Sequence, residues 1–173
     1  MQTEPERTAT TPRLGHYDID PDQSAVTFRT RHLFGLAPVH GTFAVKGGTV
    51  DIGEPVTSSS INAEIEAASF RTRSGQRDRS VLSPRFLDPG RYPVLTFSSG
   101  PVGQESQVID GTLTVRDVTR PVRLSVTRCA VSRQSFSARA TARIDRTEFG
   151  ITAARGLAGR YLDVTVEIQC VRN

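Results

Sequence analysis

The segment SFSARATARID, residues 135–145, alternates apolar and polar residues along its whole length. Successive side chains of a β-strand leave on opposite faces of the sheet, so this pattern predicts a strand with one dry face and one solvated face. Three alanines occupy the middle of the predicted dry face, namely Ala138, Ala140 and Ala142. Protein interiors are close-packed, so three small residues in a row predict that something else fills the space beside them.

The same alternation recurs along most of the chain. It predicts strands at 17–20, 24–33, 39–52 and 59–67, and again around Leu95, Ile109, Val122 and Leu162. Closely spaced alternating strands are typical of an antiparallel sandwich or barrel, and closure into a barrel removes exposed sheet edges. We therefore predict an all-β fold of about eight strands. A closed barrel of this size is just wide enough to hold one small ligand.

Residues 67–92 interrupt the alternation. Ser74 is a suitable N-cap for a short helix over 75–82, and Pro84 can begin a second short turn that ends near Gly90. We expect one or two short helices here, covering one end of the sheet. Gly47 and Gly48 predict a bulge or kink within their strand.

Length and composition favour a single soluble domain. The chain has 173 residues, of which 36% are hydrophobic and 23% charged, and no apolar run approaches the roughly 20 residues that span a bilayer. Residues 1–14 are polar and lack the apolar centre of a secretory signal. We expect a disordered leader over 1–14, a single domain over 15–173 and a cytoplasmic location.

The formal net charge is +4, and all but one of the 22 basic residues are arginine. These arginines are not interleaved with aromatic residues, which argues against nucleic-acid binding. Cys129 and Cys170 are expected to be small buried hydrophobes, and no metal-binding motif is present.

Four segments, taken in order, resemble the YceI-like family, whose members are lipocalin-like in fold and bind polyisoprenoids or related lipids. They are YDIDPDQSAVTFRTRHLFGLAPVHGTF, FRTRSGQRDRSVLSPRFLDPGRYPVLTF, GTLTVRDVTRPVRL and IDRTEFGI. The resemblance runs from about Tyr17 to the C-terminus. The chain departs from the family's pattern at Ser80, Arg85, Leu87 and Asp117, and the first three lie near the predicted pocket mouth.

The resemblance implies an extended antiparallel β-barrel around a long apolar tunnel, with the helical segment at its entrance. It also implies a lipid-binding protein that sequesters or carries an isoprenoid-like or fatty-acid-like molecule, with no catalytic residues, no cofactor and no metal. The expected tunnel lining combines the three alanines with larger apolar residues: Phe28, Phe43, Ile61, Ile65, Leu95, Phe97, Leu113, Val115, Leu124, Phe136, Val164 and Val166.

Four polar residues complete the predicted site: Thr30, His32, Arg77 and Asp78. Thr30 and His32 share the inward face of their strand. His32 can contact a ligand head group or act as a proton-sensitive gate, or it can be a buried histidine bonded to the backbone. Arg77 and Asp78 can bind a pyrophosphate or carboxylate head, or form an ion pair that pins the helix to the barrel. We expect Asp145 and Arg146 to make structural contacts at a turn.

Two other functions remain open at this stage. One is an enzyme acting on an apolar substrate, with His32, Asp78 and Ser80 as a hydrolytic triad, although no nucleophile-elbow motif is present. The other is a surface-interaction protein whose core is filled by phenylalanines: Phe34, Phe70, Phe86 and Phe149.

Two kinds of partner are also predicted. Arg71, Arg73 and Arg79 lie near the expected entrance and can attract an anionic head group or a membrane surface. An open strand edge beside the leader would let two chains pair as a homodimer.

Overall fold

The computed structural model describes residues 11–32, 36–100, 102, 107–153 and 159–173, and of His32 it describes the backbone alone. The strands are β1 (Gly15–Ile19), β2 (Ala25–His32), β3 (Ala37–Ile52), β4 (Ser60–Glu66), β5 (Val94–Ser99), β6 (Val108–Val115), β7 (Val118–Val131), β8 (Ser135–Asp145) and β9 (Tyr161–Arg172). The helix is α1 (Gly75–Val81), and the 3₁₀ turns are η1 (Pro21–Gln23), η2 (Val56–Ser58), η3 (Ala67–Ser69) and η4 (Arg146–Phe149).

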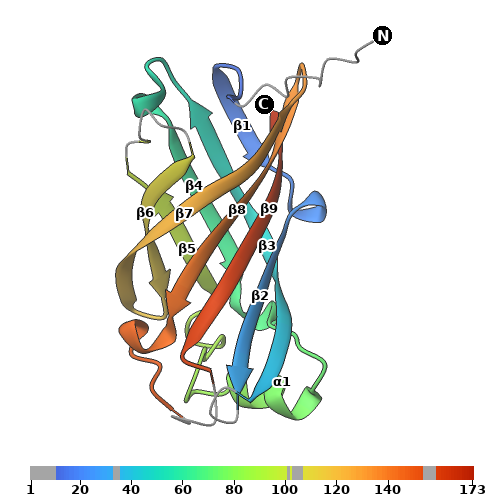
Figure 1. The fold of residues 1–173 in the computed structure, drawn as a ribbon, viewed down its shortest axis with the longest axis vertical. Helices are drawn as coiled ribbons and strands as arrows, with labels where there is room; N and C mark the ends of the chain where they lie inside the picture. The colour runs from blue at the N-terminus through green and yellow to red at the C-terminus, as the bar shows by residue number, and fades with distance from the viewer. Residues whose placement is uncertain (1–10, 33–35, 101, 103–106, 154–158) are drawn as a thin grey trace.

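Eight strands form a closed antiparallel barrel in the order β3-β2-β9-β8-β7-β6-β5-β4, with β4 pairing back onto β3 (Figure 1). The extra strand, β1, lies between the same two neighbours as β2, because Tyr17 pairs with Val50 of β3 and with Arg172 of β9. The η1 turn separates β1 from β2, so the two act as one interrupted strand position. The predicted barrel of about eight strands is confirmed.

The closure of the barrel corrects one expectation. Both sides of β1 are paired, so the open edge predicted beside the N-terminal segment is absent from the described part of the barrel. A homodimer built on that edge loses its structural basis. Residues 1–10 of the predicted leader lie outside the described residues, whereas Arg13 accepts a hydrogen bond from the Tyr17 hydroxyl at 2.9 Å.

The predicted irregularity at Gly47 and Gly48 is confirmed as a shift in the β3–β4 register between Val45 and Gly47. At Gly48 the backbone has φ +156°, and a Cβ atom there would lie 2.8 Å from the Cα of Ala63. Only glycine satisfies both conditions. A second register shift falls between Val126 and Arg128 of β7.

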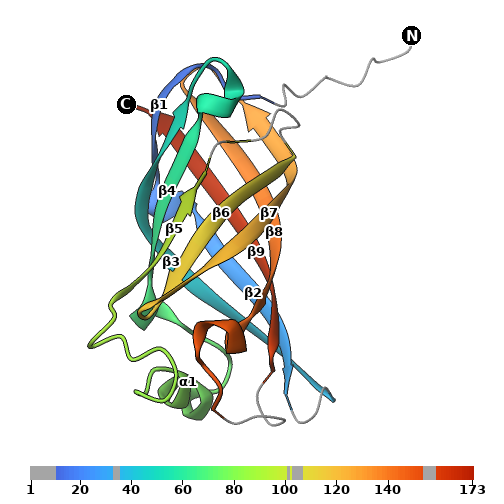
Figure 2. The same cartoon turned by 90° about the vertical axis from the view of Figure 1, so that its left-hand side faces the viewer.

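The β4–β5 connection leaves the barrel wall and folds across one end of it, where α1 lies (Figure 2). Ser74 caps α1 as predicted, its hydroxyl accepting from the Arg77 N–H at 3.2 Å. The short turn predicted after Pro84 is present as turns at 84–87 and 89–90, and no second helix forms between Pro84 and Gly90. The segment is fastened to the barrel by a pair of backbone hydrogen bonds between Thr42 and Arg71, at 2.9 and 3.1 Å.

The buried apolar residues form two clusters, one toward each end of the barrel. The cluster near β1 contains Tyr17 and Phe136, whose rings meet edge to face with centroids 4.9 Å apart. The cluster near α1 contains Phe28 and Phe70, whose rings stack at 5.3 Å, and Phe149 of η4. Most of the buried aromatic side chains thus pack in these two clusters, whereas Phe97 belongs to neither and lines the interior. Among the described residues, no helix is long and apolar enough to cross a membrane.

Candidate ligand cavity

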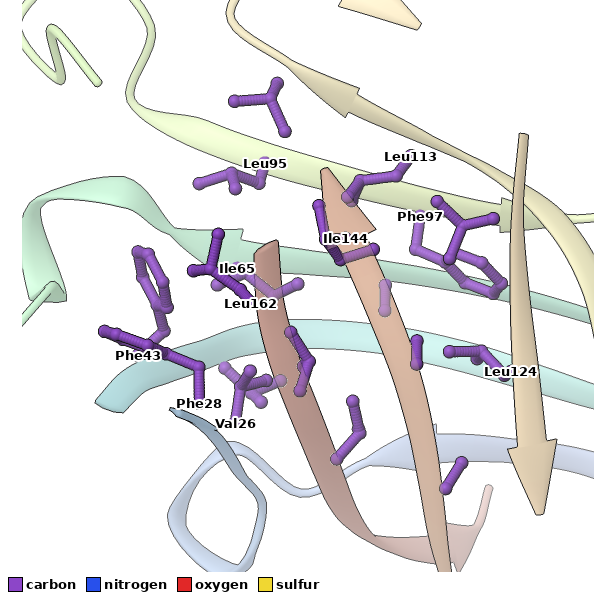
Figure 3. Close-up of a pocket in the computed structure, with 18 of the residues that line it drawn as sticks. Val26, Phe28, Phe43, Ile65, Leu95, Phe97, Leu113, Leu124, Ile144 and Leu162 are labelled. Carbon is purple, nitrogen blue, oxygen red and sulfur yellow. The ribbon is translucent and has the colours of Figure 1, made fainter. Parts of the chain in front are cut away.

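A cavity of about 820 Å³ occupies the inside of the barrel. Its wall is almost entirely apolar, and every strand position of the closed ring contributes to it. Figure 3 shows this convergence, with these labelled side chains directed toward the interior: Val26, Phe28, Phe43, Ile65, Leu95, Phe97, Leu113, Leu124, Ile144 and Leu162. Because nearly all of the inward-facing strand residues are apolar, a ligand inside the barrel would meet mainly hydrocarbon.

The three alanines of β8 lie in this wall, as their spacing predicts. Ala140 lies between Val126 of β7 and Val166 of β9 in the strand register, and all three residues line the cavity. Valines on both neighbouring strands approach the interior further than the alanine methyl groups do. The small residues of β8 therefore leave space beside the valines, which widens the cavity.

The structure places most of the predicted site residues in the cavity wall. Those that line it are Phe28, Thr30, Phe43, Ile61, Ile65, Arg77, Leu95, Phe97, Leu113, Val115, Leu124, Phe136, Ala138, Ala140, Ala142, Val164 and Val166. Their contact with a ligand remains a prediction. Phe70, Phe86 and Phe149 also line the cavity without filling it, while Phe34 lies outside the described residues.

Among the predicted site residues whose side chains the structure describes, one is absent from the wall. Asp78 does not line the cavity, and its Oδ1 instead accepts from the Thr72 N–H at 2.9 Å and from the Thr72 hydroxyl at 2.6 Å. Arg77 donates to the same hydroxyl at 3.3 Å. The helix is thus joined to the preceding turn through Thr72, and Arg77 and Asp78 do not form the predicted ion pair. The His32 side chain lies outside the described residues.

The polar part of the wall lies mainly at the α1 end. It contains three serines and a glutamine from the α1 segment, and three arginines, namely Arg77, Arg85 and Arg146. At the other end the polar lining residues are Thr11 and Ser59. The cavity is therefore apolar along its length and polar near α1, which suits a molecule with a hydrocarbon chain and one polar end.

Arg146 is buried with 9% of its surface exposed, and its guanidinium is fixed by backbone carbonyls. Nε donates to Gly159 O at 2.7 Å, while Nη1 donates to Ile151 O and Ala153 O, both at 2.9 Å. The charge also lies 5.7 Å from the centre of the Phe86 ring. These contacts confirm the structural role predicted at this turn, and Arg146 also lines the cavity, which its sequence position did not predict.

Asp145 holds the β8 end of the same turn. Its carboxylate accepts from Arg160 at 2.9 and 3.0 Å and from the Thr147 N–H at 3.0 Å. The hydrogen bonds from Arg160, with those from Thr147, lower the pKa of Asp145 to about 2. The carboxylate is therefore ionised at every physiological pH and acts as a fixed structural anion.

Both cysteines are free thiols with raised pKa values. Burial, with a smaller effect of Cys129, raises the pKa of Cys170 to about 12, and burial raises the pKa of Cys129, which lines the cavity. Thiols that remain protonated at neutral pH are weak nucleophiles, so Cys129 contributes an apolar surface to the wall. Within the described ranges, no group of three or more His, Cys, Asp or Glu side chains is placed to hold a metal ion.

Comparison with known proteins assigns nearly all of the barrel to one family, because residues 17–171 match the YceI-like domain. The chain belongs to the YceI-like family. A protein designated UPF0312 from Pseudomonas savastanoi pv. phaseolicola is 29% identical over 165 residues, covering 90% of this chain and 84% of the relative. Protein YceI of Salmonella arizonae is also 29% identical, over 166 residues, covering 90% of this chain and 86% of the relative.

Solved structures share the YceI-like barrel. BcnA of Burkholderia cenocepacia superposes with a TM-score of 0.69 at 18% identity, covering 87% of this chain and 98% of that one. A polyisoprenoid binding domain from Saccharophagus degradans, implicated in plant cell wall breakdown, has a TM-score of 0.67 at 14% identity, covering 93% and 100%. At these identities the likeness shows the YceI-like fold alone.

Proposed function

We propose that this protein binds a hydrophobic, isoprenoid-like lipid inside the barrel and sequesters or carries it without performing chemistry on it. The observation that carries the proposal is the apolar cavity of about 820 Å³. Its volume lies in the upper part of the range of roughly 300–1,000 Å³ that is usual for small-molecule sites. The polyisoprenoid binding domain of Saccharophagus degradans, which has the same fold, supports an isoprenoid as the occupant.

The cavity wall provides enough binding energy for such a ligand. Each methylene group removed from water contributes roughly 0.8 kcal/mol. A chain with about ten or more buried carbons therefore reaches micromolar affinity or better, even after the cost of association is subtracted. Apolar contact of this kind distinguishes ligands by length and width. We propose that the residues predicted to line the tunnel contact the chain, and that Thr30 and Arg77 lie nearer its polar end.

An enzyme acting in the same cavity is the main rival. Ser80 lines the cavity, but Asp78 is engaged with Thr72 and does not line the cavity. A protein whose core is filled by its own phenylalanines, acting only through its surface, is disfavoured by the cavity. Incubating the protein with a bound isoprenoid and finding a changed product, lost on Ser80→Ala, would favour the enzyme.

We further propose that the protein is cytoplasmic and meets membranes transiently while it exchanges lipid. Arg71, Arg73 and Arg79 are exposed at the end of the barrel where the polar part of the cavity lies, which supports this proposal. A basic surface is attracted to anionic head groups by roughly 1 kcal/mol per arginine near the membrane. A homodimer stays a prediction, now without the open strand edge as its basis.

Native mass spectrometry of freshly purified protein tests the proposed function. We expect a population heavier than the bare chain by the mass of one long-chain lipid, which solvent extraction then releases for identification. If the protein carries no lipid, and takes none up when incubated with geranylgeraniol, the lipid-binding proposal is wrong. Intact lipid in the extract would support a carrier, and a modified lipid would support the enzyme.

A further inference from the structure

Every charged side chain in the described part of the cavity wall is an arginine. Arg77 belongs to α1, Arg85 follows α1, and Arg146 belongs to η4. Figure 2 shows α1 and the 146–149 turn at the same end of the barrel. The described lining residues at the β1 end, among them Thr11 and Ser59, carry no charge. The cavity therefore has one positively charged end and one uncharged end.

The three guanidinium groups differ in how tightly they are held. Arg146 is nearly buried and fixed by three hydrogen bonds to backbone carbonyls, so its charge stays at the cavity wall. Arg77 is half-buried and donates one side-chain hydrogen bond, to Thr72. Arg85 is exposed, and within the described residues it makes no hydrogen bond or ion pair. A guanidinium has five N–H donors, so Arg77 and Arg85 retain donors for a ligand.

The surrounding segment strengthens this positive potential. Residues 71–91 contain six arginines and two aspartates, a formal charge of +4 that equals the formal net charge of the whole chain. The two aspartates, Asp78 and Asp88, do not line the cavity. Positive charge above a low-dielectric wall concentrates anions at the opening and favours their binding.

We propose that the ligand is an amphiphile with an anionic head, a phosphate or a carboxylate, bound with its head at the α1 end and its tail toward β1. The proposal rests on the proposed lipid-binding function and adds the head group and the orientation. Arg77 and Arg85 would donate charge-assisted hydrogen bonds to the anion, which are about twice as strong as neutral ones. The fixed Arg146 would add attraction from within the wall.

The test compares two ligands that share one tail, geranylgeranyl monophosphate and geranylgeraniol, each radiolabelled and kept below its critical micelle concentration. We expect the wild-type protein to bind the phosphate on the order of tenfold more tightly than the alcohol. This preference should shrink as salt is raised, because salt screens exposed charges. Palmitate against hexadecanol repeats the comparison for a carboxylate, and inorganic phosphate shows whether the anion alone competes.

The double variant Arg77→Gln/Arg85→Gln should bring the ratio of the two affinities close to one. The matched control is Arg128→Gln/Arg133→Gln, which removes the same charge from exposed residues that do not line the cavity. The control should keep the wild-type ratio. A wild-type ratio near one, or a ratio that falls equally in both double variants, would overturn the head-group proposal alone. Failure of the wild type to bind either ligand would overturn it together with the proposed function.

Discussion

At Ala140 a methyl group faces the interior where the neighbouring strands carry Val126 and Val166. Two residues away on either side, Ala138 pairs with Cys129 and Ile168, and Ala142 pairs with Val164. Because a β-strand sends every second side chain inward, three alanines at this spacing produce a continuous strip of reduced volume along β8. The cavity therefore depends on the small size of these alanines, as well as on the apolar side chains that surround it.

Asp145 makes a prediction about pH. Its pKa in the folded protein is about 2, against an ordinary value of 3.8, so the folded state prefers the ionised carboxylate. A lowered pKa contributes stability that is complete above the ordinary value and is lost as the pH falls through the folded value. We expect the stability advantage of the wild type over Asp145→Asn to be constant from neutral pH to about pH 5 and to shrink between pH 4 and 2.

Chemical denaturation at a series of pH values, with both proteins under identical salt, measures this advantage. Asp163→Asn is a suitable control, because it removes the same charge from an exposed residue of β9. The wild type and the control should therefore differ little in pH dependence. An advantage over Asp145→Asn that is unchanged at pH 2 would contradict the assignment.

The inward residues of the barrel were predictable because each follows from local alternation. Ala140, Phe97 and Val164 line the cavity as their strand positions require. The polar residues at the α1 end were harder to place, since no periodicity governs the irregular segment. Asp78 follows a residue that lines the cavity, yet its carboxylate is bonded to Thr72. Arg146 reaches the wall through the geometry of η4, and a buried arginine in a turn gives no signal in the sequence beyond its type.

Among the elements, the α1 segment covers one end of the barrel and contributes most of the polar residues of the cavity wall. It is held by backbone hydrogen bonds at both of its connections: Thr42 with Arg71, and the Ala67 N–H with Pro93 O at 3.0 Å. Ser69 adds a hydrogen bond from its hydroxyl oxygen, which accepts from the Ala44 N–H at 2.7 Å. The helix has only seven residues, so these anchors and its packing stabilise it more than its own helix propensity does.

Asp78 is the side chain that ties α1 to the preceding turn. Asp78→Ala removes the acceptor of two Thr72 hydrogen bonds and should destabilise the protein by roughly 1–2 kcal/mol. Asp78→Asn keeps an acceptor oxygen in the same place and should retain more than half of that stability. Urea denaturation gives both values, and hydrogen exchange should show the loss of protection concentrated in 75–82. If Asp78→Ala and Asp78→Asn destabilise the protein equally, the stabilisation comes from the negative charge of Asp78 in an ion pair and not from its hydrogen bonds to Thr72.

Some boundaries and pairings of the helices and strands can be predicted from the local sequence alone. Ser74 caps α1 as its residue type predicts, and the alternation of β8 and β9 fixes their pairing over 11 residue pairs. The interruption between β1 and β2 was also visible in the sequence, at Pro21. The sequence did not predict that β1 and β2 share one position between β3 and β9, because this follows only from the pairing of the closed sheet.

In the whole molecule, the closed ring of strands encloses the cavity. A ring of eight strands leaves an interior just wide enough for side chains or one small ligand, and the choice between the two depends on side-chain volume. Here most of the buried aromatic residues belong to the two end clusters, around Tyr17 and Phe136 and around Phe28 and Phe70. The middle remains open, and a bound chain would stabilise the folded state by about 2.7 kcal/mol at a ligand concentration 100 times the dissociation constant.

We propose that a hydrocarbon chain occupies the middle of the barrel, and binding of radiolabelled geranylgeraniol to the variant Ala140→Phe provides a test. The new ring would stand among the lining residues of β7, β8 and β9 and fill the space that the chain needs. The control is Ala130→Phe, which adds the same ring on β7 at a position outside the cavity wall. Circular dichroism establishes that both variants are folded. We predict wild-type binding of one chain per protein in the control and at least tenfold weaker binding in Ala140→Phe, whereas undiminished binding by folded Ala140→Phe would contradict the account.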